Sequence, residues 1–288
     1  MKGNLPQKNE KKYSVGDIVS FSVIVLLCAA MAVLDFVKIR YTSDAVNNEL
    51  ISDTVPLAVG SIAVIWLMIR GKTRLFGRPA HLLYLLPALL VAVNNFPFHS
   101  HFTGKTELLH TGVDNWILFA LYCAFVGIFE ECVFRGILFP LMAGSFSDDK
   151  KGLWKTFLFS SLAFGGMHLF NIFAGGGVGP SILQVGYSTL IGGLCAYVLM
   201  KTKNILLCAL IHGGYDFAGL LLPKLGGGAV FDWQTMAIMA VVGVAVGLFV
   251  LYAVWKYSDE ERIELYEKLG FGAASLKKND LPSEEREK

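Results

Sequence analysis

Three ionisable side chains occur together in one apolar stretch of the sequence. The run F-E-E-C-V-F-R-G contains Glu130, Glu131 and Arg135. Each charged group at membrane depth costs at least about 2.5–3.5 kcal/mol, so a chain retains such groups for a reason. Glu131 and Arg135 are spaced i,i+4 and can pair on one helix face, whereas Glu130 points about 100° away. A buried ion pair that fixes helix packing would explain Glu131 and Arg135, but not the second glutamate.

Two histidines lie in other apolar stretches, each beside a glycine pair. His168 ends the run F-G-G-M-H, and His212 begins H-G-G-Y-D, which places Asp216 at i+4. Glycine pairs let neighbouring helix backbones approach closely and leave room around an imidazole. A lone histidine in a membrane helix is commonly a packing residue. Two of them, in a chain that also buries adjacent glutamates, favour a chemical role.

These residue types can activate water. A carboxylate beside an imidazole can hold and deprotonate a water molecule, and a second imidazole can stabilise a developing oxyanion. The same residue types can form an open zinc shell, for which His168, His212 and Glu131 are the candidate ligands. Arg135 beside that shell would oppose a metal by charge repulsion, which favours the metal-free reaction. The residue types are compatible with both reactions, and zinc is the candidate cofactor.

Other intramembrane protease classes lack support in the sequence. It contains no H-E-x-x-H zinc helix and no G-x-S-x-G serine elbow. Tyr215-Asp216 and Pro87-Ala88-Leu89 resemble aspartyl-protease motifs, but no G-x-G-D supplies the second aspartate and the order of the two motifs is reversed. We interpret both matches as chance.

The composition indicates a membrane protein. Of 288 residues, 54% are hydrophobic and 17% charged, and the mean hydropathy is +0.54. Soluble domains average about 45–50% apolar and about 25% charged residues. A net charge of +2 is too small to indicate nucleic-acid binding. Five cysteines lie in apolar runs without C-x-x-C spacing, which indicates packing residues: Cys28, Cys123, Cys132, Cys195 and Cys208.

Eight apolar stretches are candidates for the transmembrane helices that must position the charged groups. A helix needs roughly 20 mostly apolar residues to cross a bilayer. The predicted spans are 17–37, 55–70, 81–98, 115–141, 155–173, 181–200, 204–222 and 234–256. The first is predicted to be a retained helix, because no signal-peptide cleavage site follows it. The glutamates and the arginine fall in the fourth span, His168 in the fifth, and His212 with Asp216 in the seventh.

The distribution of Lys and Arg predicts the orientation. Alternate connections and both tails contain 20 of these residues on one side and 4 on the other. By the positive-inside rule, both termini are cytoplasmic. The predicted organisation is a cytosolic tail (1–16), one membrane domain (17–256) and a charged cytosolic tail (257–288). Glu130 would lie about 22 Å from the outer start of its helix, in the cytoplasmic half of the membrane.

The three motifs together resemble those of a known family. E-E-x-x-x-R (Glu130, Glu131, Arg135), F-x-x-x-H (Phe164, His168) and H-x-x-x-D (His212, Asp216) occur in this order on three spans. This arrangement is similar to the CPBP family, the CAAX-protease and bacteriocin-processing intramembrane proteases, also called Abi or Rce1-like. The resemblance covers about residues 115–222.

The resemblance implies an all-α, eight-helix endopeptidase whose site opens towards the cytosol or inner leaflet. It implies that Glu130 is the general base, that His168 helps to orient the water, and that Glu131 and Arg135 support the site. It assigns His212 and its i+4 partner to the oxyanion side. The family often has Asn at that last position. Asp216 cannot donate a hydrogen bond when ionised, so it could instead orient His212 or bind a metal. The family has been described both as metalloproteases and as glutamate-type proteases.

We therefore expect an intramembrane endopeptidase that hydrolyses a membrane-associated or lipidated peptide or protein in a prokaryotic plasma membrane. Its predicted partners are that substrate and the lipid bilayer, and not nucleic acid. Prenylated C-a-a-X tails, leader peptides and bacteriocin self-immunity are each implied by a branch of the family. The alternative is a non-catalytic transporter, or a bacteriocin-immunity or scaffold protein, whose buried charges are structural.

Overall fold

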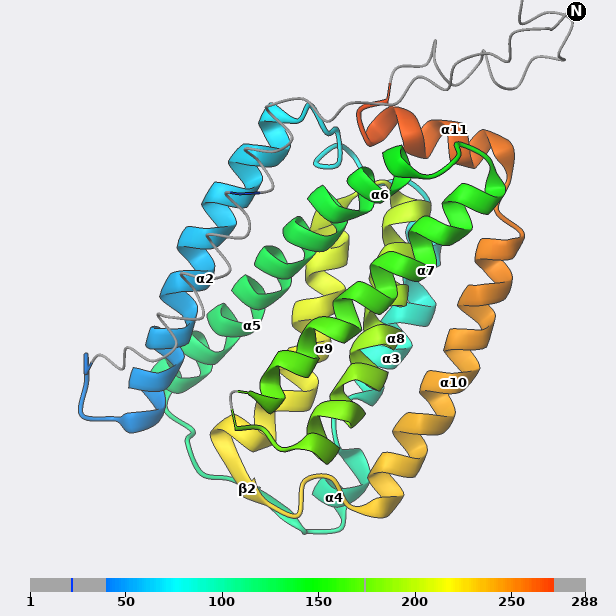
Figure 1. Cartoon of the computed structure of the whole chain (residues 1–288). Helices are drawn as coiled ribbons and strands as arrows, with labels where there is room; N and C mark the ends of the chain where they lie inside the picture. Colours follow the sequence, from blue (N-terminus) through cyan, green and yellow to red (C-terminus); the bar gives the residue numbers. More distant parts are fainter. Residues whose placement is uncertain (1–21, 23–39, 174, 272–288) are drawn as a thin grey trace, which may run out of the picture.

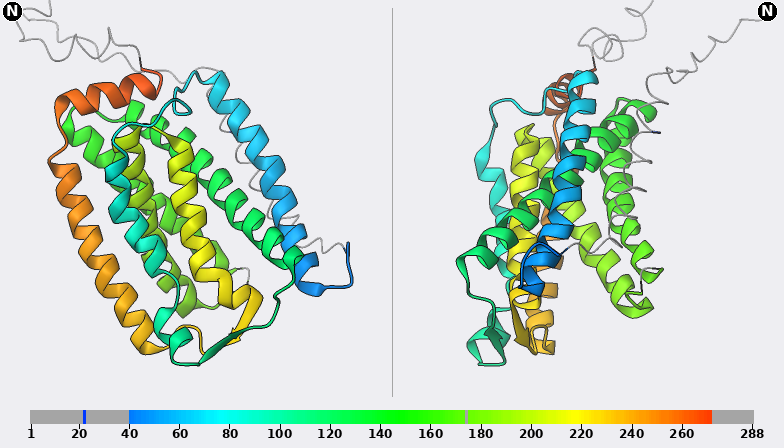
Figure 2. Two further views of the ribbon diagram at one scale, coloured as in Figure 1. Left: turned by 180° about the vertical axis from the view of Figure 1, so that it is seen from behind. Right: turned by 90° about the vertical axis from the view of Figure 1, so that its left-hand side faces the viewer.

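The computed structural model describes Ser22 and residues 40–173 and 175–271. The predicted N-terminal tail, the first span (apart from Ser22), Cys28 and residues 272–288 of the predicted C-terminal tail lie outside these residues. The described part is a bundle of helices that run alongside one another (Figures 1 and 2). Its helices of nine residues or more are α2 (Ala45–Arg70), α3 (Leu86–Asn94), α5 (Val113–Val133), α7 (Lys150–Met167), α8 (Val178–Thr202), α9 (Ile205–Leu225), α10 (Trp233–Trp255) and α11 (Asp259–Lys268).

Shorter elements connect these helices. They are the 3-10 turns η1 (Leu82–Leu85) and η3 (His168–Ile172), the π turn η2 (Phe134–Leu138), the helices α4 (Phe98–Phe102) and α6 (Phe139–Ser145), and the strands β1 (Thr106–Leu108) and β2 (Gly226–Gly228). The two strands pair antiparallel. The described part is therefore all-α apart from this small ribbon, as predicted.

Five helices of the described part are long and apolar enough to cross a membrane. They are α2, the continuous helix Val113–Ser145, α8, α9 and α10. The predicted span 81–98 corresponds to a shorter apolar helix, Leu82–Asn94. The predicted span 155–173 corresponds to α7 and η3, and α7 contains three lysines within its 18 residues. Each predicted span after the first thus coincides with a helix, but five of them meet the length and hydropathy expected of a crossing.

Helix α2 starts ten residues before the predicted span at residue 55. Its N-cap is Asp44, whose carboxylate accepts hydrogen bonds from the N–H groups of Val46 and Asn47. The first turns contain Glu49 and Asp53, which a hydropathy criterion excludes from a span. Lys224 of α9 lies 2.5 Å from Glu49 and 3.8 Å from Asp53, so these charges have a partner within the bundle.

Helices α5 and α9, which contain two of the motifs, pack closely against each other. A Cβ on Gly127 of α5 would lie 2.5 Å from the carbonyl oxygen of Ala209. A Cβ on Gly213 of α9 would lie 2.8 Å from the carbonyl oxygen of Cys123. Any larger residue at either position would therefore push the two backbones apart. The predicted role of a glycine next to His212 is confirmed at Gly213.

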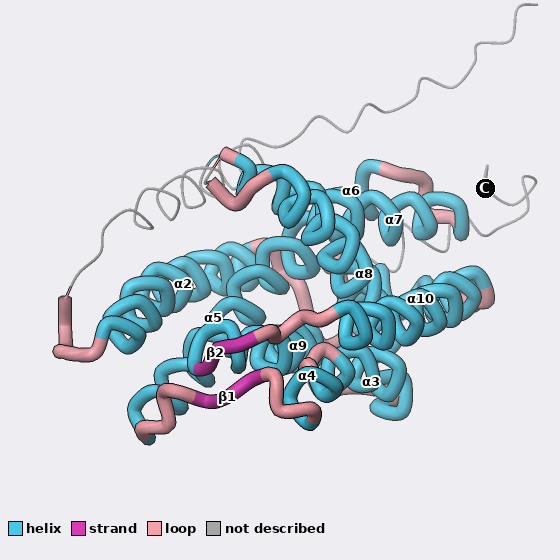
Figure 3. The backbone as a smooth tube through the Cα atoms, turned by 90° about the horizontal axis from the view of Figure 1, so that it is seen from below, coloured by secondary structure: helices cyan, strands magenta, loops and turns pink. Residues whose placement is uncertain are grey.

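The Lys/Arg-rich connections gather at one end of the bundle, together with α11 (Figure 1). The Arg74 N–H donates to the carbonyl oxygen of Lys268 (2.8 Å), and the Asn204 side-chain amide donates to that of Gly77 (2.6 Å). We call this end, formed by residues 71–81, 146–150, 201–204 and 257–271, the basic end. The β1–β2 ribbon lies at the opposite end (Figure 3). The orientation of the basic end in a membrane stays a prediction.

Candidate active site

The predicted pair between Glu131 and Arg135 is formed, and both side chains are completely buried. The Nη1 atom of Arg135 donates to Oε1 of Glu131 at 3.2 Å. The Nη2 atom donates to the carbonyl oxygen of Gly192 on α8. A guanidinium in a low-dielectric interior needs such partners, because an unpaired buried charge is strongly destabilising. The pair therefore connects α5 and η2 to α8.

Arg135 lies in a π turn that the sequence analysis did not predict. The N–H of Phe139 donates to the carbonyl oxygen of Phe134, five residues earlier. Such turns occur often at functional sites. A Cβ on Gly136 would lie 2.3 Å from the sulfur of Met68, so glycine lets α2 approach the turn. The sequence features that indicate an irregularity here are the glycine directly after Arg135 and Pro140, which has no N–H for the regular bond to residue 136.

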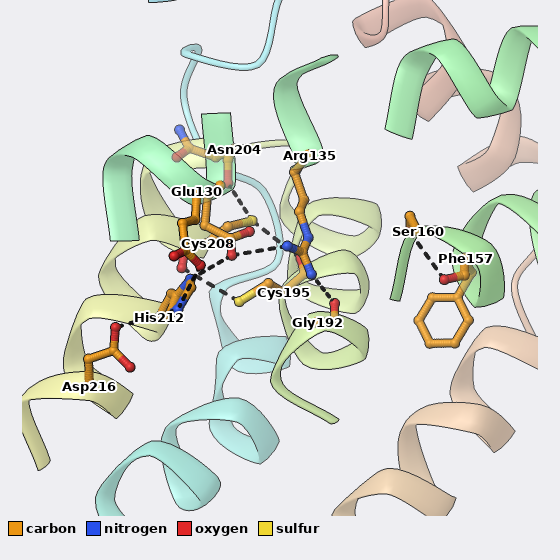
Figure 4. A network of polar contacts seen from close by, with 11 residues as sticks. Glu130, Arg135, Phe157, Ser160, Gly192, Cys195, Asn204, Cys208, His212 and Asp216 are labelled. Carbon is orange, nitrogen blue, oxygen red and sulfur yellow. Dashed lines mark hydrogen bonds and ion pairs between the residues drawn. The ribbon is translucent and has the colours of Figure 1, made fainter. Parts of the chain in front are cut away.

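His212 forms the centre of a carboxylate cluster (Figure 4). Its Nδ1 atom lies 2.9 Å from Oε1 of Glu131. Its Nε2 atom lies 3.8 Å from Oε2 of Glu130 and 3.5 Å from Oδ2 of Asp216. Because an ionised carboxylate can only accept, we assign the Nδ1 proton to the bond with Glu131. The Nε2 atom then faces the other two carboxylates.

The two adjacent glutamates have different environments. The Glu131 side chain is 0% exposed, and its Oε1 atom accepts from both Arg135 and His212. Its Oε2 atom has no hydrogen-bond partner among the described residues. The Glu130 side chain is 19% exposed, and that of Asp216 is 17% exposed. One glutamate is thus locked inside the protein while the other keeps an accessible carboxylate.

His168 lies outside this hydrogen-bonded cluster but shares a neighbour with it. It follows the last residue of α7 and begins η3. Its ring centroid is 5.7 Å from that of Phe164, which is itself 5.4 Å from the ring of His212. The Arg135 guanidinium carbon lies 4.7 Å from the same phenyl ring. Phe164 therefore contacts one member of each motif, a role that the sequence analysis missed.

The buried cysteines are consistent with packing. All four in the described part are free and at most 2% exposed. The thiol of Cys208 donates to the carbonyl oxygen of Cys195 (3.4 Å), and the thiol of Cys195 donates to that of Cys208 (3.7 Å). These contacts join the facing sides of α8 and α9 beside the ion pair.

The described residues do not form a zinc shell. They contain no group of three or more His, Cys, Asp or Glu side chains placed to hold a metal ion. Of the three candidate ligands, Glu131 is engaged by Arg135 and His212. A metal at Glu131 would also lie next to a guanidinium and would be repelled by it. The donor set therefore fits hydrogen bonding better than metal coordination.

Comparison with known proteins gives one match. Residues 112–218 match the model of a family described as type II CAAX prenyl endopeptidase Rce1-like. No curated protein and no solved structure matches the chain. The matched segment extends from the start of α5 into α9 and contains all three motifs. With its five candidate spans, the chain is an integral membrane protein, and the predicted resemblance to the CPBP family is confirmed over residues 112–218.

Proposed function

We propose that this chain is an intramembrane endopeptidase that hydrolyses a peptide bond in a membrane-associated, CAAX-type substrate. The observation that carries the proposal is the difference in burial and pairing between the two adjacent glutamates. Glu131 is completely buried and paired, whereas Glu130 keeps 19% of its side chain exposed beside His212. A purely structural ion pair accounts for Glu131 and leaves the accessible carboxylate without a role.

Glu130 is the proposed general base. Its carboxylate takes a proton from a water molecule, whose oxygen attacks the carbonyl carbon of the scissile bond. His168 forms no hydrogen bond with another described residue, so its ring nitrogens are available to orient that water or the substrate. The proton held by Glu130 then passes to the leaving nitrogen as the C–N bond breaks. General acid–base catalysis of this kind contributes about 10²–10⁴-fold.

His212 is the proposed oxyanion-stabilising group. Its Nδ1 is held by Glu131, which fixes the ring orientation and leaves Nε2 directed towards Glu130 and Asp216. When Nε2 is protonated, it can donate to the oxyanion of the tetrahedral intermediate. Asp216 is 3.5 Å from Nε2. We propose that it favours the protonated imidazole and acts through His212, in place of the amide donor that the family often has there.

The proposed orientation places the basic end of the bundle in the cytoplasm. It rests on the positive-inside rule and on the gathering of the Lys/Arg-rich connections at that end. His212 is eight residues after the N-cap Asn204 of α9, or about 12 Å from that end. The site would then open towards the inner leaflet of a prokaryotic plasma membrane.

The test is cleavage of a quenched fluorescent peptide that ends in C-a-a-X, offered with and without a prenyl group on its cysteine. Purified full-length protein should release fluorescence, with products identified by mass spectrometry, and should keep this activity after chelator treatment. Glu130→Gln should be inactive, while Glu107→Gln, at an exposed position of β1, should behave as wild type. No cleavage of either peptide, or full activity of Glu130→Gln, would reject the proposal and favour a non-catalytic membrane protein. Activity lost on chelation and restored by Zn²⁺ would reject the metal-free reaction.

A further inference from the structure

A basic and aromatic cavity lies at the basic end of the bundle, away from the candidate active site. It has a volume of about 410 Å³ and is lined by Lys150, Lys151, Trp154, Trp255 and Lys256. These residues come from the first turns of α7 and from the end of α10 (Figure 1). His168 follows the opposite end of α7, about 27 Å along an 18-residue helix. The cavity therefore plays no part in the proposed hydrolysis.

The three lysines bring positive charge together at the cavity, where Glu260 and Asp149 interact with Lys150 and Lys151 through electrostatics alone. Lys150, Lys151 and Lys256 are exposed, and none of them forms an ion pair within the described part of the chain. Asp149, the nearest acidic residue in sequence, already accepts hydrogen bonds from the Gly152 N–H and the Ser147 hydroxyl, both at 2.7 Å. Lysines in the first turn of α7 also oppose the helix dipole, which favours anions at that position. An anion in the cavity would reduce the repulsion among the lysines and would interact favourably with the dipole of α7.

The tryptophans place the cavity at the level of lipid headgroups. Trp255 is the last residue of α10 and is 61% exposed. Trp154 is half-buried against Phe157, with ring centroids 5.9 Å apart. The ammonium group of Lys256 lies 4.7 Å from the ring of Trp255. Tryptophan concentrates at the membrane–water interface, where one part of the ring contacts acyl chains and the other contacts headgroups.

We propose that this cavity binds the headgroup of an anionic phospholipid. The lysine ammonium groups would contact the phosphate, and the two indole rings would lie beside the glycerol and the upper acyl chains. Basic pockets between membrane helices on the cytoplasmic side are suited to such lipids. A soluble anion would use the lysines alone, whereas a lipid also gives the tryptophans a function.

The test is lipid binding by full-length protein in detergent, measured by native mass spectrometry. Phosphatidylglycerol and phosphatidylcholine with identical acyl chains are titrated against wild type and two triple variants. The cavity variant is Lys150→Gln, Lys151→Gln, Lys256→Gln. The control is Lys72→Gln, Arg74→Gln, Arg78→Gln, which removes the same charge from exposed residues at the same end. Wild type should prefer phosphatidylglycerol, and the cavity variant should bind it roughly 100-fold more weakly, from about fivefold per lysine.

The control variant should keep the affinity of wild type. An unchanged affinity in the cavity variant, or an equal loss in both variants, would overturn the proposal, because binding would then reflect diffuse surface charge. Inorganic phosphate and a Trp154→Leu, Trp255→Leu variant distinguish the source of the anion. If phosphate displaces the lipid at equal concentration and the tryptophan variant binds lipid normally, the cavity takes a soluble anion and the proposal is wrong. Melting midpoints show that each variant is folded.

Discussion

Glutamine in place of either adjacent glutamate removes one charge at almost constant volume, yet we expect the two variants to fail in different ways. Glu131→Gln should destabilise the fold. Glu130→Gln should leave the fold intact and abolish turnover. The contrast follows from their environments, because Glu131 is 0% exposed and Glu130 is 19% exposed.

The magnitudes follow from what each carboxylate contacts. Glu131 accepts from Arg135 at 3.2 Å and from His212 at 2.9 Å. A neutral amide there leaves the guanidinium buried without a counterion, and the Nε atom of Arg135 already lacks a partner among the described residues. Breaking a buried pair costs about 3–5 kcal/mol. Glu130 makes one 3.8 Å contact with His212, so its loss should cost less than about 1 kcal/mol. The same change should lower kcat by about 10²–10⁴-fold.

The assay uses the protein's own thiols. Four cysteines of the described part, Cys123, Cys132, Cys195 and Cys208, are buried and free, so a fluorogenic thiol reagent reports their exposure on heating. A Cys28→Ser background removes the fifth. A change of 1 kcal/mol shifts the melting midpoint of a chain of this size by roughly 2–4 °C. Glu131→Gln should therefore melt roughly 6–20 °C below wild type and Glu130→Gln within about 4 °C.

Peptide cleavage by the same preparations completes the comparison. If both variants melt together far below wild type, Glu130 is a structural residue and the proposed base is wrong. If Glu131→Gln melts normally but is inactive, the roles of the two glutamates are reversed. Wild-type turnover in Glu130→Gln would show that Glu130 is not the general base.

Two further predictions concern the N-cap of α2 and the orientation of the bundle. The pKa of Asp44 lies below its ordinary value, because the Asn115 side-chain amide and the Asn47 backbone N–H donate to its carboxylate. A lowered folded-state pKa means that its ionised form stabilises the fold at neutral pH, and that this contribution disappears as the pH falls below about 4. Asp44→Ala should cost about 1–2 kcal/mol at pH 7, and the gap in melting midpoint from wild type should narrow as the pH falls below about 4 towards the lowered folded-state pKa; a constant gap would contradict this. A membrane-impermeant thiol reagent applied outside intact cells should label Thr103→Cys and not Ser147→Cys, and the opposite pattern would invert the proposed orientation.

Local spacing predicted the parts of the site that depend on one helix. The i,i+4 rule gave the Glu131–Arg135 pair, and the 100° step between neighbours separated Glu130 from it. Local spacing did not predict the hydrogen-bond partner of His212 Nδ1, because Asp216 at i+4 was the local candidate. In the structure Glu131, 81 residues earlier, holds Nδ1, while Asp216 lies 3.5 Å from Nε2. That arrangement depends on which faces of α5 and α9 meet, which the glycines permit but do not specify.

Other features depended on interactions that no single helix reveals. Hydropathy placed the start of the second predicted span at residue 55, after Glu49 and Asp53, although Lys224 of α9 pairs with both carboxylates. Phe164 appeared in a motif as a neighbour of His168, but its contacts with Arg135 and His212 come from the packing of α7 against other helices. The basic cavity joins residues about 100 positions apart in sequence and has no motif of its own.

The π turn at Phe134–Leu138 also bears on how this helix can change length in evolution. A π turn holds about one residue more than the α turn that it replaces, so α6 continues with its faces rotated by about 100° from those of an unbroken helix. The two glutamates precede the turn and keep their positions whether it is present or not. Loss of one residue here would restore regular pitch, move Gly136 away from Met68 and turn a different side of α6 towards the lipid. In an alignment of related sequences, a one-residue gap within positions 134–138 would therefore mark the loss of this turn, and not an error in placing the motif.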